Sequence, residues 1–123
     1  MEATTENPDY NGLKDCLGKT FITKHDSHYA ITEQGEFRGR PSIEGAKVKK
    51  VVGVERAVYN LVRYCLGYSA GESQLDELIT EYGQPVRPGL HLVASLTPEY
   101  VRKTNRYGIV TSPVKKIRKI KPA

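Results

Sequence analysis

Apolar residues between positions 54 and 66 recur at the spacing of one helix face. They are Val54, Ala57, Val58, Leu61, Val62, Cys65 and Leu66. Intervals of three and four residues place these side chains on one side of an α-helix, so the pattern predicts a helix over residues 55–66. Gly67 follows and is placed to end the helix in a left-handed conformation. We expect Leu61 to be buried, with the helix as the central element packed on a sheet.

Short β-type segments stand on both sides of this helix. Before it, residues 20–23 and 28–32 predict a hairpin, and apolar residues alternate with lysines in a strand over residues 46–52. After it, residues 90–96 form an apolar run of strand length, and residues 107–111 predict a last strand. The chain therefore supplies enough short strands for one small sheet.

A second, acidic helix is predicted between the two groups of strands. Ser73 and Asp76 have the spacing of a capping box, and Gly83 stands where that helix should stop. The order of strands, two helices and strands predicts an α+β fold. We expect a small curled antiparallel sheet or a partly open β-barrel, with the two helices inserted midway.

Five basic side chains near the C-terminus equal the whole net charge. They are Lys115, Lys116, Arg118, Lys119 and Lys121, and the formal net charge of the chain is +5. Residues 1–113 are therefore balanced, with fourteen basic and fourteen acidic residues. A cationic segment on a neutral body favours a polyanionic partner, most often nucleic acid, because binding releases condensed counterions.

Polarity and charge divide the chain into three parts. We expect a flexible lead-in over residues 1–12, one α+β domain over residues 13–113 and a basic tail over residues 114–123. If the tail is an arm that lies along phosphates, cutting the chain after Pro113 should leave folding almost unchanged. The alternative is a last strand, because the tail also contains Val and Ile residues that would complete the sheet.

A second basic cluster precedes the main helix. Its members are Arg38, Arg40, Lys47, Lys49 and Lys50, together with Arg56 at the start of the helix. Arg40 lies in a Gly-Arg-Pro loop, which is expected to hold its guanidinium rigidly enough to fork onto a phosphate. Arg38 follows Phe37, and Arg106 precedes Tyr107. Such pairs are typical of proteins that stack on unpaired bases, although both rings are alternatively ordinary core-facing residues.

Histidines offer the nearest approach to catalytic chemistry. His25, Asp26 and His28 are a metal-like grouping, but no fourth ligand stands nearby, so neither a metal nor a cofactor is predicted. Alternatively, His25 or His28 would act with Lys24 and the distant His91 as general acid and base in metal-free RNA cleavage. The sequence contains no Gly-rich phosphate loop and no nucleophile elbow. An enzyme is therefore the less favoured interpretation.

The two cysteines and the short apolar segments bear on location. Cys16 and Cys65 are expected to be reduced, with Cys65 a small core residue of the main helix. No segment approaches the roughly 20 apolar residues that span a bilayer, so we expect no membrane partner. The acidic N-terminal residues do not have the layout of a signal peptide, which favours a cytoplasmic location.

These features rank three functions. The first is a non-enzymatic nucleic-acid-associated module, a candidate regulator, that contacts phosphates of DNA or RNA through the basic tail and the basic loop and strand. The first alternative is a protein-protein interaction or adaptor domain, for which eight tyrosines supply interface anchors. The second alternative is a small metal-independent ribonuclease.

Overall fold

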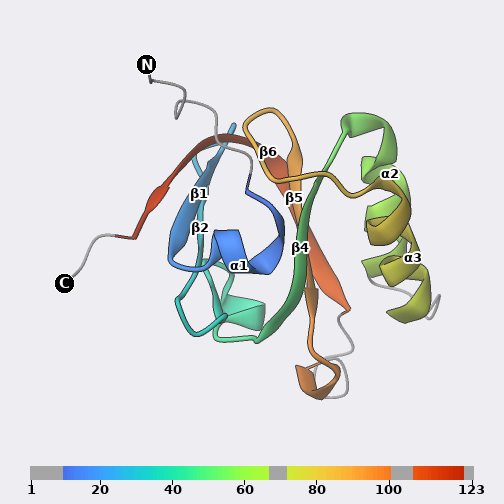
Figure 1. The fold of residues 1–123 in the computed structure, drawn as a ribbon, viewed down its shortest axis with the longest axis horizontal. Helices are drawn as coiled ribbons and strands as arrows, with labels where there is room; N and C mark the ends of the chain where they lie inside the picture. Colours follow the sequence, from blue (N-terminus) through green and yellow to red (C-terminus); the bar gives the residue numbers. More distant parts are fainter. Residues whose placement is uncertain (1–9, 67–71, 101–106, 121–123) are drawn as a thin grey trace.

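The computed structural model describes residues 10–66, 72–100 and 107–120 (Figure 1). Its elements are, in chain order, α1 (Gly12–Cys16), β1 (Lys19–Thr23), β2 (His28–Ile31), β3 (Phe37–Arg38), η2 (Pro41–Ile43), β4 (Val48–Val54), α2 (Arg56–Leu66), α3 (Glu72–Tyr82), β5 (His91–Leu96) and β6 (Gly108–Lys119). Gly67, Arg106 and Lys121 lie outside the described residues, as does most of the expected lead-in. The flexible lead-in expected over residues 1–12 is wrong for residues 10–12, because Tyr10 and Val86 exchange backbone hydrogen bonds of 3.0 and 2.9 Å and α1 begins at Gly12.

Six strands form one antiparallel sheet in the order β3-β2-β1-β6-β5-β4. The sheet curls without closing into a barrel, and α2 and α3 are inserted between β4 and β5 (Figure 1). Its two ends approach each other at an isolated bridge between Glu36 and Lys47. The predicted α+β fold is confirmed, and so is the predicted hairpin, in which Phe21 of β1 pairs with Tyr29 of β2.

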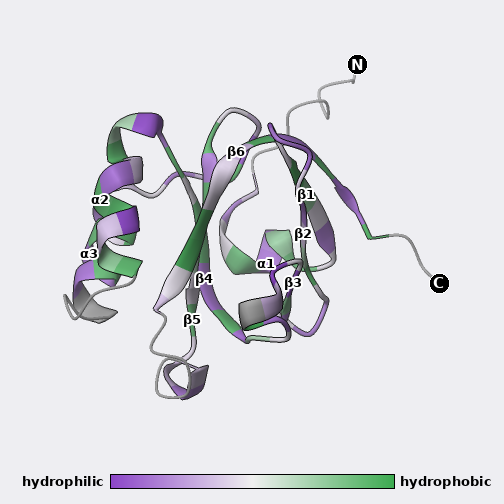
Figure 2. Cartoon of the chain, turned by 180° about the vertical axis from the view of Figure 1, so that it is seen from behind, coloured by the Kyte–Doolittle hydropathy of each residue, from purple (hydrophilic) through white to green (hydrophobic). Residues whose placement is uncertain are grey.

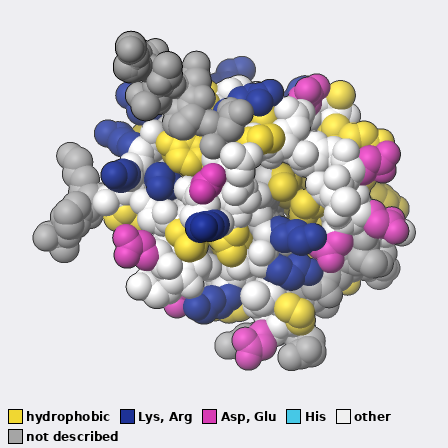
Figure 3. All heavy atoms as spheres, in the orientation of Figure 1, with side chains coloured by type: hydrophobic (Ala, Val, Ile, Leu, Met, Phe, Trp, Pro, Cys, Tyr) yellow, Lys and Arg dark blue, Asp and Glu magenta, His cyan; other side chains and the backbone are white. Residues whose placement is uncertain are grey.

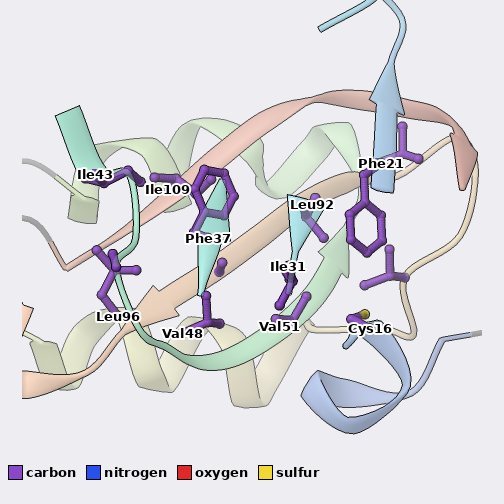
Figure 4. Close-up of a cluster of buried hydrophobic side chains, with 14 residues drawn as sticks. Cys16, Phe21, Ile31, Phe37, Ile43, Val48, Val51, Leu92, Leu96 and Ile109 are labelled. Carbon is purple, nitrogen blue, oxygen red and sulfur yellow. The ribbon is translucent and has the colours of Figure 1, made fainter. Parts of the chain in front are cut away.

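A first hydrophobic core fills the inside of the curled sheet (Figure 4). Every strand contributes to it, through Phe21, Ile31, Phe37, Val51, Leu92 and Ile109. Helix α1 packs against the same cluster through the fully buried Cys16. Phe37 therefore faces the core, which leaves it unavailable for stacking on a base.

Helices α2 and α3 cover the opposite face of β4, β5 and the first part of β6 (Figure 2). This second core consists of Val54, Val62, Cys65, Leu75, Ile79 and Val93. All six residues of β5 are buried because both faces of that strand are covered. Tyr107 packs partly against this core. The predicted burial of Cys65 is confirmed, and Cys16 and Cys65 are free thiols in different cores.

The prediction that Leu61 is buried is wrong. Its side chain is 52% exposed, whereas that of the neighbouring Val62 is 0% exposed. Successive helix residues differ by about 100° around the axis, and α2 buries only the sector that faces the sheet and α3. Leu61 instead lines a shallow hollow of about 360 Å³ between α2 and α3, with Tyr64 and Leu78. The apolar stripe is thus wider than the buried sector.

The separate tail expected from residue 114 is also wrong over residues 114–119. Strand β6 continues to Lys119 and lies between β1 and β5, so that Ile117 pairs with Phe21 and Val114 is 1% exposed in the first core. Register shifts on both sides of β6 bend it near Pro113. A proline in a central strand is tolerated at such bulges, because no ladder donor is needed there. The alternative of a last strand is therefore the observed one.

Candidate nucleic-acid interface

One half of the sheet presents an outer face on which basic residues lie. Side chains alternate along a strand, so Phe21 and Ile117 point into the core while their neighbours Thr20 and Arg118 point outward, where they pair. Lys116, two residues before Arg118, pairs with Ile22 on the same face. Among the described elements, α2 and α3 cover only the other half of the sheet (Figure 1). The outer face of β1, β2 and the end of β6 is therefore left open by these helices.

A shallow hollow marks this open face. It has a volume of about 290 Å³ and is lined by Thr20, His28, Arg118 and Lys119. We call Lys116, Arg118 and Lys119 the β6 basic patch. All three are exposed, and none forms an ion pair with another described residue. Lys and Arg side chains gather at the edge of the molecule where β6 ends (Figure 3).

Lys115, unlike these three residues, forms an ion pair. Its Nζ lies 2.6 Å from Oδ1 of Asp26, in the turn between β1 and β2. The hydrogen bond from the ammonium group, together with its charge, holds the pKa of Asp26 below its ordinary value. The ion pair balances the charge of Lys115 itself. Of the predicted tail residues that are described, Lys115 is thus the one committed to a partner within the protein.

Arg38 lies on the open face but is flanked by carboxylates. It pairs with Ala30 of β2, on the same row as Thr20. Its guanidinium approaches Glu36 at 3.3 Å and Glu44 at 3.6 Å. The edge of the open face at β3 is therefore locally balanced in charge, and the cationic character concentrates at β6.

Arg40 is turned away from the open face. Its Nη2 donates to the hydroxyl of Tyr29 at 3.3 Å, and its guanidinium lies 5.7 Å from the centroid of that ring. Tyr29 in turn stacks on Phe37, with centroids 5.6 Å apart. Arg40 is half-buried and ties its loop to β2, so it occupies a structural corner of the first core.

The lysines of the second basic cluster also lie apart from the β6 basic patch. The Nζ of Lys47 donates to the Gln34 carbonyl at 2.9 Å. Lys49 forms an ion pair of 3.1 Å with Asp76 of α3. Lys50 is exposed on β4, the strand at the far end of the sheet from β3. Basic residues that lie close together in the sequence are thus separated in the folded chain.

The histidines divide between two places. His28 lies in the hollow of the open face. The sequence reasoning missed this position and that of Thr20, because they depend on the register of β1 with β2 and with β6. Lys24, His25 and His91 line a different hollow, beside Arg56 and Tyr59 of α2. Within the described ranges, no group of three or more His, Cys, Asp and Glu residues could hold a metal ion.

Comparison with other proteins adds no assignment. The chain matches no protein-family model, and no curated protein or solved structure was found to be similar to it. In the described part of the chain, no helix has both the length and the apolar character needed to cross a membrane.

Proposed function

We propose that this protein is a non-enzymatic nucleic-acid-binding module that contacts backbone phosphates through the β6 basic patch. The observation that carries the proposal is a group of three exposed cations without ion-pair partners among the described residues, two of which, Arg118 and Lys119, line an open hollow. A regulatory role in the cytoplasm is part of the proposal, since such a module acts by occupying its target. DNA and RNA both present the phosphates that it requires.

The chemistry of the hollow suits a phosphodiester backbone. Arg118 presents a guanidinium that can donate two parallel hydrogen bonds to one phosphate, and Lys119 adds a mobile ammonium group. The Thr20 hydroxyl and the His28 ring add a short donor and a flat surface for one base or sugar. Contacts of this kind favour binding with little dependence on base sequence.

The strand position of the patch affects its affinity. Lys116 and Arg118 stand on β6, which is paired with β1 at both positions. Their backbone is ordered before any ligand arrives, so association does not have to fix it. The cost of binding is then limited mainly to the side-chain rotamers.

A salt titration with a random-sequence oligonucleotide tests the proposal. Three phosphate contacts predict a slope of log affinity against log salt of about −2 to −3. The variant K116Q/R118Q/K119Q should lose nearly all of this slope. The matched control K14Q/K47Q/R63Q removes two exposed lysines and one exposed arginine elsewhere and should keep it.

Two results would reject the proposal. One is equal binding by the two triple variants, which would mean that only net charge matters. The other is the absence of oligonucleotide binding at low salt. In that event the hollow between α2 and α3, where Leu61 and Tyr64 are 52% and 63% exposed, becomes the surface to test for a protein partner. Turnover of RNA by the purified chain would instead favour the ribonuclease alternative.

A further inference from the structure

A second hollow lies at the N-terminal turn of α2, separate from the β6 basic patch. Its volume is about 400 Å³, and its lining includes Lys24, His25, Arg56, Tyr59 and His91. It reaches Pro113 on β6, and about 17 Å of strand separate that residue from Arg118, at roughly 3.3 Å per residue. The two hollows share no lining residue and are therefore distinct, although His25 and His28 bring both to the turn between β1 and β2.

His91 is the most unusual residue of this hollow. It is 1% exposed, and its Nδ1 lies 2.8 Å from the carbonyl oxygen of Thr111. A carbonyl oxygen only accepts, so Nδ1 carries the ring hydrogen and Nε2 is left as an acceptor. Nε2 is buried and has no hydrogen-bond partner among the described residues. A buried polar atom in this state requires an explanation, and an unfilled ligand site is one.

The surroundings of His91 are cationic. The guanidinium of Arg56 lies 5.0 Å from the Tyr59 ring centroid, and the Tyr59 ring lies 4.4 Å from the His91 ring, tilted by 35°. Lys24 and His25 approach from the turn after β1. Arg56 is also the first residue of an eleven-residue helix, whose N-terminus adds partial positive charge.

Carboxylates that lie close in sequence are engaged elsewhere. Glu55 accepts a hydrogen bond of 3.1 Å from the side chain of Gln84, and Asp26 holds Lys115. No carboxylate is among the described residues that line the hollow. Positive charge, a helix N-terminus and an unpartnered buried nitrogen thus meet at one place.

We propose that this hollow binds a phosphate group, with His91 as the buried recognition residue. Nε2 takes a proton from solvent or from dihydrogen phosphate, which becomes hydrogen phosphate, and the resulting N–H donates to a phosphate oxygen. Arg56 and Lys24 balance the negative charge. The Tyr59 ring covers His91, so the Arg56–Tyr59 stack must swing aside as the ligand enters. This site goes beyond the proposed nucleic-acid function and does not depend on the β6 basic patch.

Nuclear magnetic resonance of the histidine ring nitrogens in the full chain tests the proposal directly. Titration with inorganic phosphate should move the Nε2 signal of His91 saturably, from an unprotonated toward a protonated ring nitrogen. The Tyr59 ring signals should shift along the same curve. Sodium chloride at matched ionic strength should leave both in place. A His91 signal that does not respond to phosphate, or that responds equally to chloride, overturns the site.

Variants of exposed residues avoid disturbing the buried histidine. Lys24→Gln and Arg56→Gln should each weaken phosphate binding by about tenfold or more, the effect of losing a charge-assisted hydrogen bond. Lys14→Gln, an exposed lysine on α1, is the matched control and should bind phosphate as the parent chain does. Unchanged phosphate affinity in both test variants rejects the assignment.

Two further experiments identify the source of the phosphate and distinguish this proposal from the proposed nucleic-acid function. If a 5′-phosphorylated oligonucleotide shifts the His91 signal and its 5′-hydroxyl counterpart does not, the ligand is the phosphorylated end of a strand. Shifts with inorganic phosphate or a mononucleotide alone identify a free ligand. In K116Q/R118Q/K119Q the response of His91 to inorganic phosphate should persist, and its loss there contradicts the separation of the two sites.

Discussion

Lys49 of β4 reaches across to Asp76 of α3, with its Nζ 3.1 Å from Oδ2. This ion pair joins the sheet to the acidic helix, and both side chains are about one-third exposed. A lysine that the sequence places among nucleic-acid contacts therefore has an internal partner. The availability of a cation depends on the folded chain as well as on the sequence around it.

Loss of the Lys49–Asp76 pair should affect stability and leave nucleic-acid binding intact. Lys49→Ala should lower the free energy of unfolding by about 1 kcal/mol or less, because partly exposed ion pairs are screened by water. A double-mutant cycle with Asp76→Ala, measured by urea denaturation, isolates the pair. Oligonucleotide affinity should be the same in all four proteins, and a loss of affinity in Lys49→Ala would return this lysine to the interface.

Arg118 and Lys115 should differ in their effect on binding although both are cations of β6. Arg118→Gln should cost about 1.5 to 3 kcal/mol of oligonucleotide affinity, the range for a hydrogen bond to a charged group. Lys115→Gln should cost little, because Lys115 already pairs with Asp26. Fluorescence anisotropy at one fixed salt concentration measures both. Equal losses would mean that the ion pair opens when nucleic acid binds.

Cutting the chain after Pro113 should abolish cooperative folding. The cut removes Val114 from the first core and takes away one of the two strands that pair with β1, including Ile117 opposite Phe21. Far-ultraviolet circular dichroism should show no cooperative thermal transition. A cut after Ile120 is the control, since β6 ends at Lys119, and it should melt like the full chain. A folded product of the first cut would restore the interpretation of a separate tail.

Leu61 and Leu75 form a matched pair for the helical layer. Leu75→Ala empties a fully buried site and should cost about 2 to 5 kcal/mol. Leu61→Ala changes a side chain that is 52% exposed and should alter stability by about 0.5 kcal/mol or less. Chemical denaturation of both variants gives the comparison directly. Equal costs would show that Leu61 is covered in solution.

Cys16 should make stability fall at alkaline pH. Burial raises the pKa of its thiol from 9.0 to about 12, with a smaller contribution from Asp15. The unfolded chain therefore loses this proton first, and the stability that the protonated thiol contributes is complete below pH 9.0 and is lost as pH rises toward 12. The free energy of unfolding, measured with urea across this pH range, should fall more steeply with pH for the parent than for Cys16→Ala. Parallel curves would contradict the burial of the thiol.

Helix α2 and strand β6 show what the sequence could predict and what it could not. The pattern that predicts α2 is local, because residues on one face of a helix recur every three or four positions. The bounds of the helix follow from that pattern. Strand β6 has no regular alternation, since bulges near Pro113 change which residues face the core. Its role depends on a pairing with β1 at the other end of the chain, which no short window contains.

The candidate interface divides in the same way. The sequence alone predicted every cation of the β6 basic patch, because a basic side chain is recognised from the residue type at each position. It could not separate these residues from Arg38, Lys49 and Lys115, whose carboxylate partners are brought close by turns or by strand and helix packing. The positions of His28 and Thr20 could not be predicted for a related reason, since these residues join the patch only through strand register.

The central position of β6 also orders events during synthesis. Strands β1 to β5 emerge first, yet β1 and β5 both have β6 as a neighbour in the sheet, which pairs Phe21 with Ile117 and Ala94 with Ile109. Until β6 has been made, β1 and β5 each present an unpaired edge that can recruit a strand of another chain. Such late, long-range pairing is slow. The period of greatest exposure to aggregation therefore falls just before β6 is complete, and a chaperone that covers these edges would act in that interval.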